Sequence, residues 1–122
     1  MRRMLAVFVA GLLLLAVTPV RAHHAEPLYD MKNPTTVKGV VGKVDWGNPH
    51  VYIYLSVKND RGGGDEWALE LTSPNSLKHH GWKSDTVKAG DEIACTGGRS
   101  KTRARTMRCA TVELPDGRKL RS

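Results

Sequence analysis

Two neighbouring segments place a large apolar residue at every second position, and this pattern constrains the fold more than any other feature of the sequence. In residues 50–57 every second side chain is apolar: Val51, Ile53, Leu55 and Val57. Residues 66–71 repeat the pattern with Trp67, Leu69 and Leu71. A period of two is typical of half-buried β-strands. The glycine-rich "NDRGGGD" between the segments predicts the loop of an antiparallel hairpin.

Three more strands and one helix are predicted around this hairpin. The valine-rich residues 37–46 predict a long first strand, which Gly39 and Gly42 interrupt as glycines do at bends and bulges. Ser73-Pro74 before "NSLKHHG" predicts a short helix that ends at Gly81. Two final strands are expected at 92–97 and 107–114.

The order of these elements favours one architecture. A helix between the third and fourth of five strands is typical of the small Greek-key barrel called the OB fold. We therefore predict an all-β, OB-like barrel over residues 36–122, preceded by an extended N-terminal arm over 23–35. An open β-sandwich is the alternative. Barrels of this type serve many unrelated functions, so the predicted fold does not name one.

Residues 1–22 predict a signal peptide for export. Arg2 and Arg3 give a positive start, residues 5–17 are uncharged and apolar, and Val20-Arg21-Ala22 is a small-x-small cleavage site. The apolar run is shorter than the roughly 20 residues of a membrane-spanning helix. An uncleaved anchor is the alternative. We expect a periplasmic or secreted protein that keeps no stable membrane span after cleavage.

Cys95 and Cys109 are the only cysteines in the sequence. They lie at equal distances from residue 102, so a symmetric hairpin would make them facing residues and a disulfide pair. Such a bond suits an oxidising compartment and would stabilise the fold by about 3 kcal/mol. A metal or redox pair is the alternative, although the spacing differs from Cys-x-x-Cys.

The charge balance is basic. Removal of the leader lowers the number of lysines and arginines from 19 to 16 against 12 acids, so the net charge falls from +7 to +4. The last quarter of the chain holds many of these cations: Arg99, Lys101, Arg103, Arg105, Arg108, Arg118, Lys119 and Arg121. In an exported protein such a segment favours an anionic glycan or lipid over nucleic acid, or is simply a solvated surface.

The histidines near the predicted cleavage site indicate a metal-binding hypothesis. Cleavage there would make His23 the N-terminal residue, whose amine and imidazole can chelate a metal at neutral pH. With His24 and His50 it would supply the nitrogen ligands that Cu(II) prefers, and Glu26 or Asp30 would add an oxygen. The alternative is that these histidines are solvated or pack against the barrel.

Tyr52 and Tyr54 share the non-core face of the second predicted strand. OB barrels bind ligands over the second and third strands, where aromatic rings stack on sugars or bases. Ordinary cross-strand packing is the alternative. Neither a nucleophilic triad nor a phosphate-binding loop can be identified, so we expect a protein without catalytic activity.

Several segments together resemble the small exported bacterial proteins of the domain of unknown function 6152 family. They are the His-His at residues 23–24, the W-x-N-P-H of 46–50, and the S-P-N-x-L of 73–77 followed by Gly81-Trp82. The resemblance covers about residues 23–120. It implies a periplasmic OB-like barrel and no particular activity. The cysteine pair is not part of the family pattern.

These observations leave three functional hypotheses in order of preference. The first is a non-catalytic periplasmic OB-like module that binds a small ligand or an anionic glycan of unknown specificity. The second is a copper-binding protein that uses His23 with His24 and His50. The third is a small oxidative copper enzyme. Nucleic acid is disfavoured as a partner because of the predicted export.

Overall fold

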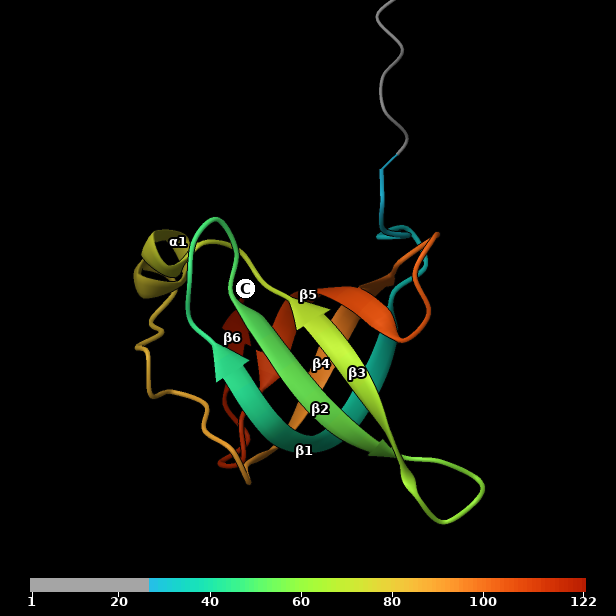
Figure 1. Cartoon of the computed structure of the whole chain (residues 1–122). Coiled ribbons are helices and arrows are strands. Elements are labelled where there is room, and N and C mark those ends of the chain that lie inside the picture. Colours follow the sequence, from blue (N-terminus) through green and yellow to red (C-terminus); the bar gives the residue numbers. More distant parts are fainter. Residues whose placement is uncertain (1–26) are drawn as a thin grey trace, which may run out of the picture.

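The computed structural model describes residues 27–122, which form an all-β barrel with one short helix (Figure 1). The predicted signal peptide and the residues His23, His24 and Glu26 lie outside the described residues. No helix within 27–122 is long and apolar enough to cross a membrane.

Six strands and one helix follow each other along the chain. They are β1 (Thr35–Asp45), β2 (Tyr52–Lys58), β3 (Gly64–Glu70), α1 (Pro74–His79), β4 (Glu92–Arg99), β5 (Thr106–Glu113) and β6 (Lys119–Arg121). The five longer strands and the helix match the predicted order. The short strand β6 was not predicted, and it pairs with the end of β5.

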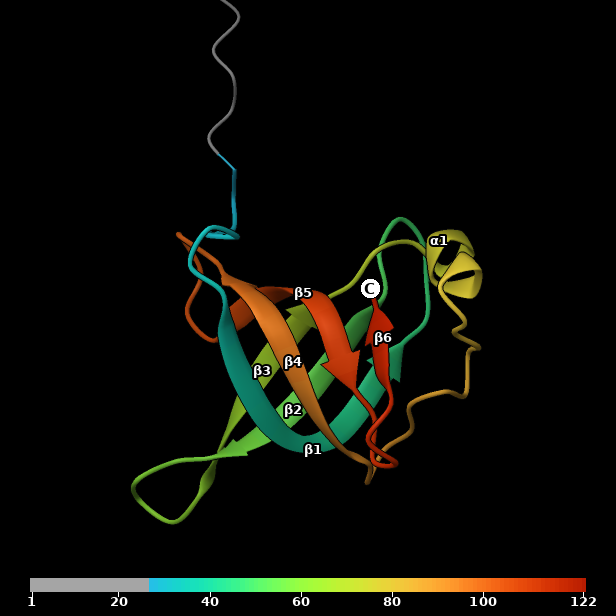
Figure 2. The same ribbon diagram turned by 180° about the vertical axis from the view of Figure 1, so that it is seen from behind.

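The sheet closes on itself. Antiparallel pairing gives the order β3-β2-β1-β4-β5-β6, and a parallel pairing of β3 with β5 joins the two sides. Figure 2 shows β1, β4, β5 and β6 from the side opposite to β2 and β3. The prediction of a five-stranded OB-like barrel is therefore confirmed, and the open sandwich is excluded.

The two glycines of β1 have the predicted effect on the strand. The register with β2 shifts between Val41 and Lys43, so a bulge lies at Gly42. At Gly39 a Cβ atom would lie 2.4 Å from the carbonyl oxygen of Ser56, so only glycine allows this approach of β2. The long first strand can thus curve around the barrel and pair with both β2 and β4.

The alternating side chains fill the barrel as predicted. Ile53, Leu55 and Leu69 are fully buried, whereas Tyr52 and Tyr54 lie on the outer face. The helix begins after Ser73, whose hydroxyl accepts a hydrogen bond from the backbone N–H of Ser76 at 3.2 Å. Leu77 of this helix joins the core.

Cys95 and Cys109 form the predicted disulfide, with Cα atoms 5.6 Å apart, and both residues are buried. The predicted symmetric register is wrong, because Cys95 lies opposite Val112 and Cys109 lies opposite Gly97. A register shift between Thr96 and Gly97 accompanies this offset. The bond therefore runs diagonally between β4 and β5.

Candidate functional site

Glu70 is the last residue of β3 and the centre of a polar cluster. The alternation along β3 directs it to the outer face, opposite in direction to Leu69, yet it is only 7% exposed. It is the only acidic residue that is buried among residues 27–122. A buried carboxylate requires partners, because desolvation of an unpaired charge is costly.

One carboxylate oxygen of Glu70 faces two cationic or ionisable side chains. Nδ1 of His50 lies 2.8 Å from Oε1, and Nη1 of Arg108 lies 3.5 Å from the same atom. His50 lies two residues before the start of β2 and directly follows Pro49, whose peptide bond with Asn48 is cis. Arg108 lies beside Glu70 in the parallel pairing of β3 and β5.

The other oxygen faces the N-terminal arm and the segment between β4 and β5. The Tyr29 hydroxyl donates a hydrogen bond to Oε2, and Nη2 of Arg103 lies 3.9 Å from that oxygen. The same Arg103 nitrogen donates to the Tyr29 hydroxyl at 2.9 Å. We call the five residues Tyr29, His50, Glu70, Arg103 and Arg108 the Glu70 cluster.

Backbone hydrogen bonds hold the arm where Tyr29 reaches Glu70. The N–H of Asp30 donates to the carbonyl of Arg99 at 2.9 Å, and the N–H of Lys101 donates to that of Leu28 at 3.0 Å. Tyr29 and Ser100 also form an isolated antiparallel bridge. Figure 1 shows the arm beside the β4–β5 segment at one end of the barrel.

The cluster carries more positive than negative charge, because two guanidinium groups face a single carboxylate. Burial and the bond to Glu70 raise the pKa of Tyr29 from 10.0 to about 12. Burial and the charge of Glu70 also raise the pKa of Tyr52, which lies opposite Glu70 on β2. Both phenols therefore stay protonated at neutral pH and remain hydrogen-bond donors.

Tyr52 and Tyr54 continue the outer surface away from the cluster. Their ring centroids are 6.5 Å apart and the ring planes are inclined by 23°. Nζ of Lys43 lies 5.9 Å from the centroid of the Tyr54 ring. A hollow of about 330 Å³ follows, lined by Gly42, Lys43, Tyr54 and Glu66. We call Lys43, Tyr52 and Tyr54 together the tyrosine face.

The predicted metal ligands are only partly within the described chain. His50 belongs to the Glu70 cluster, whereas His23, His24 and Glu26 lie outside the described residues. The carboxylate of Asp30 accepts hydrogen bonds from Nδ2 of Asn33 at 3.0 and 3.2 Å. Among residues 27–122, no group of three or more histidine, cysteine or acidic side chains is placed to hold a metal.

Sequence reasoning missed Glu70 as a functional residue and did not single out Tyr29. Glu70 occupies an outward position of an alternating strand, where a glutamate is expected to be solvated. Arg103 and Arg108 were recognised only as members of a basic segment. The cluster can be recognised only when the parallel pairing of β3 with β5 and its register are known, because this pairing brings Arg108 beside Glu70.

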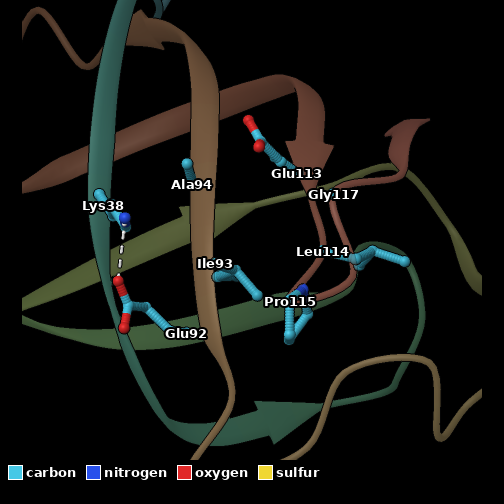
Figure 3. Close-up of a pocket in the computed structure, with 8 residues that line it drawn as sticks. All are labelled: Lys38, Glu92, Ile93, Ala94, Glu113, Leu114, Pro115 and Gly117. Atoms are coloured by element: carbon cyan, nitrogen blue, oxygen red, sulfur yellow. Dashed lines mark ion pairs between the residues drawn. The ribbon is translucent and has the colours of Figure 1, made fainter.

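A second hollow lies on the β4 and β5 side of the barrel (Figure 3). It measures about 450 Å³, and β1, β4 and the turn after β5 line it. Its Lys38 and Glu92 form an ion pair at 3.0 Å, with both side chains well exposed. Exposed pairs of this kind contribute little energy. The Glu70 cluster, with its buried carboxylate, is the better candidate site.

Comparisons with known proteins identify the family but not an activity. Among solved structures, the crystal structure of the ZRD-deleted mutant of TiaS in complex with agmatine matches with a TM-score of 0.48 and 13% sequence identity. The match covers 67% of this chain and 21% of the TiaS chain, so this chain spans about a fifth of that protein. No curated protein matches the chain. The model of the family of unknown function DUF6152 matches residues 11–108, and the chain therefore belongs to this family.

Proposed function

We propose that this chain is a non-catalytic ligand-binding module of an exported protein, and that the ligand binds across the tyrosine face and the Glu70 cluster. The observation that carries the proposal is the gathering of donors around one buried carboxylate. They come from the arm, from the segments before β2 and after β4, and from β5. OB barrels bind ligands over strands 2 and 3 and the loops β1–β2 and β4–β5.

Export is part of the proposal. The disulfide between Cys95 and Cys109 suits an oxidising compartment. Residues 1–22 have the charged start, apolar run and cleavage pattern of a signal peptide. Mass spectrometry of the protein from separate periplasmic and cytoplasmic extracts tests this directly. A chain that begins at His23 supports the proposal, and a chain that retains Met1 in the cytoplasm contradicts it.

A defined set of compounds tests ligand binding. We would titrate isotope-labelled protein with acidic and neutral oligosaccharides, tripeptides and short-chain phosphatidylglycerol, and follow amide shifts by NMR. The expected result is saturable shifts at Tyr52, Tyr54 and Glu70 with at least one compound. The hollow around Lys38 and Glu92 is the internal control. Shifts confined to that hollow, or no shifts with any compound, would contradict the proposal.

Copper binding is the second candidate, because His50 has the environment of a metal-binding histidine. In metal-ligating histidines, the ring nitrogen that does not bind the metal commonly pairs with a carboxylate. Nδ1 of His50 pairs with Glu70 in this way. Nε2 then remains for a metal, and the side chain is 39% exposed. His23 precedes Tyr29 by six residues. Six extended residues reach at most about 20 Å, so His23 lies within that distance of Tyr29, which contacts the same Glu70 as His50.

Electron paramagnetic resonance tests this second candidate. Correctly cleaved protein without an N-terminal tag is titrated with Cu(II), beside the variants His50→Ala and, as a control, His79→Ala. We expect a multi-nitrogen copper signal that only His50→Ala alters. Unchanged affinity in His50→Ala contradicts the copper site. Oxygen consumption by the copper-loaded protein with a reductant, in excess of that of the same copper concentration in buffer, would favour an oxidative copper enzyme over a binding protein.

A further inference from the structure

We infer that the ligand is an acidic oligosaccharide, whose carboxylates pair with Arg103 and Arg108 and whose sugar rings lie on Tyr52 and Tyr54. This inference rests on the proposed ligand-binding function. It adds the chemical class of the ligand.

The hydrogen-bond donors of the Glu70 cluster outnumber its acceptors. Each guanidinium has five N–H donors, but Arg108 reaches Glu70 through one nitrogen and Arg103 mainly reaches the Tyr29 hydroxyl. Both oxygens of Glu70 already have partners. The side chain of Arg103 is 56% exposed and that of Arg108 is 28% exposed. Their remaining N–H groups can therefore meet an external carboxylate, a group that matches the guanidinium fork.

An aromatic surface lies beside these arginines. Tyr52 lies directly opposite Glu70, and Tyr54 is its next same-face neighbour on β2. The two phenol rings stack on each other with planes inclined by 23°, and together they form an aromatic patch with polar hydroxyl groups. Rings of this type suit ligands with one apolar side and many hydroxyl groups. A single small anion would leave this surface unused.

Positively charged groups lie near both tyrosines. Arg103 and Arg108 lie at Glu70, opposite Tyr52, and the ammonium of Lys43 lies 5.9 Å from the centroid of the Tyr54 ring, at a hollow that the acidic Glu66 also lines. A ligand with one charged end would engage one of these groups. A ligand with repeated carboxylates along a chain of sugars would engage both.

Nucleic acid would satisfy part of the same chemistry, but the disulfide argues against it. Cysteine pairs of this kind persist in oxidising compartments. Acidic polysaccharides are present at cell surfaces, outside the reducing cytoplasm. The acidic glycan is therefore the class that agrees with both the site and the compartment.

A pair of matched ligands tests the inference. Oligogalacturonate and its fully methyl-esterified form have the same sugar chain, but only the first carries carboxylates. Isothermal titration calorimetry at low and high salt measures the affinity of the protein for both compounds, with oligothymidylate as a third ligand. We expect oligogalacturonate to bind at least about tenfold more tightly than its ester, and salt to weaken the binding.

Arginine variants locate the effect. Arg103→Gln and Arg108→Gln should each weaken oligogalacturonate binding by about tenfold or more. Arg118→Gln, whose side chain pairs with Asp116 in the turn after β5, should leave it unchanged. Arg103 is the decisive position because its side chain is 56% exposed, and circular dichroism checks that Arg103→Gln keeps the fold.

Each other result overturns the inference in a recognisable way. Equal binding of oligogalacturonate and its ester at Tyr52 and Tyr54 would contradict an acidic ligand, but it would leave the proposed ligand-binding function intact. Tighter binding of oligothymidylate would assign the face to nucleic acid. Absence of oligogalacturonate binding, with shifts from another compound in the NMR set, would replace the ligand class. Absence of any binding would overturn the proposed function as well.

Discussion

The hydroxyl of Tyr29 donates a hydrogen bond to the carboxylate of Glu70, which follows it by 41 residues in the chain. This buried contact fastens the N-terminal arm to the end of β3, and Arg103 completes it from the segment between β4 and β5. The arm is therefore a wall of the candidate site. The first two predictions concern this contact.

Replacement of Glu70 by glutamine should destabilise the fold. The change removes the charge that His50, Arg103 and Arg108 face, and it leaves guanidinium groups without a counterion. Hydrogen bonds to charged groups contribute about 1.5–3 kcal/mol, so we expect a loss of about 2 kcal/mol in the free energy of unfolding. Urea denaturation measures it. Glu92→Gln, in an exposed pair with Lys38, is the control and should have no measurable effect. Equal stability of the two variants would contradict the prediction.

The stability of the protein should depend on Tyr29 at high pH. Its pKa is raised to about 12 from 10.0, so between pH 10 and 12 the unfolded chain releases this proton more readily than the folded one. The stabilising contribution is complete below pH 10 and is lost as the pH rises towards 12. In Tyr29→Phe this part of the decline should be absent, whereas Tyr54→Phe should retain it. Thermal unfolding followed across this pH range is the measurement, and parallel declines in all three proteins would refute the assignment.

Loss of the disulfide should weaken the barrel without changing its topology. Cys95 and Cys109 close a segment with a sequence separation of 14. A closed loop of this size corresponds to about 3 kcal/mol in the chain-entropy description. Reduction of the native protein and the double variant Cys95→Ala/Cys109→Ala should both lower the urea midpoint. An unchanged midpoint under reducing conditions would show that the bond contributes nothing.

A side chain at position 98 should lift the arm from the barrel. A Cβ atom on Gly98 would lie 2.7 Å from the carbonyl group of Asp30 and 2.7 Å from the sulfur of Met31. Gly98→Ala should therefore speed amide hydrogen exchange at Asp30 and Lys101, whose N–H groups bond across this junction. Gly63→Ala is the control, because its nearest neighbours are side-chain atoms of Asn59 at 3.8 Å. Identical exchange at Asp30 in both variants would contradict the packing described here.

The strands were predictable because their side chains alternate with burial. Ile53, Leu55 and Leu69 repeat every second position, and each is fully buried. Strand β6 escaped prediction because three residues are too few to show a period. The cysteine register was wrong because the symmetry of the sequence about residue 102 carries no information on the shift at Thr96 and Gly97.

The candidate site was less predictable than the fold. His50 and the tyrosines were found because each has a local signal, a Pro-His turn or an aromatic pair on one strand face. Glu70 has no such signal, since its burial depends on residues that the fold brings from distant positions. The charge imbalance at Arg108 follows only from the parallel pairing of β3 with β5.

That parallel pairing is the shortest join in the five-stranded barrel, with three residue pairs between Ala68↔Thr106 and Glu70↔Arg108 against seven between β2 and β3. We therefore expect β3 and β5 to separate before the other strand pairs when the barrel opens locally. A ligand that binds both Arg108 on β5 and Tyr52 on β2 would hold the strands together across the pairing of β3 with β5. Ligand binding would then raise the force needed to unzip the barrel, by an amount set by the ligand concentration relative to its Kd.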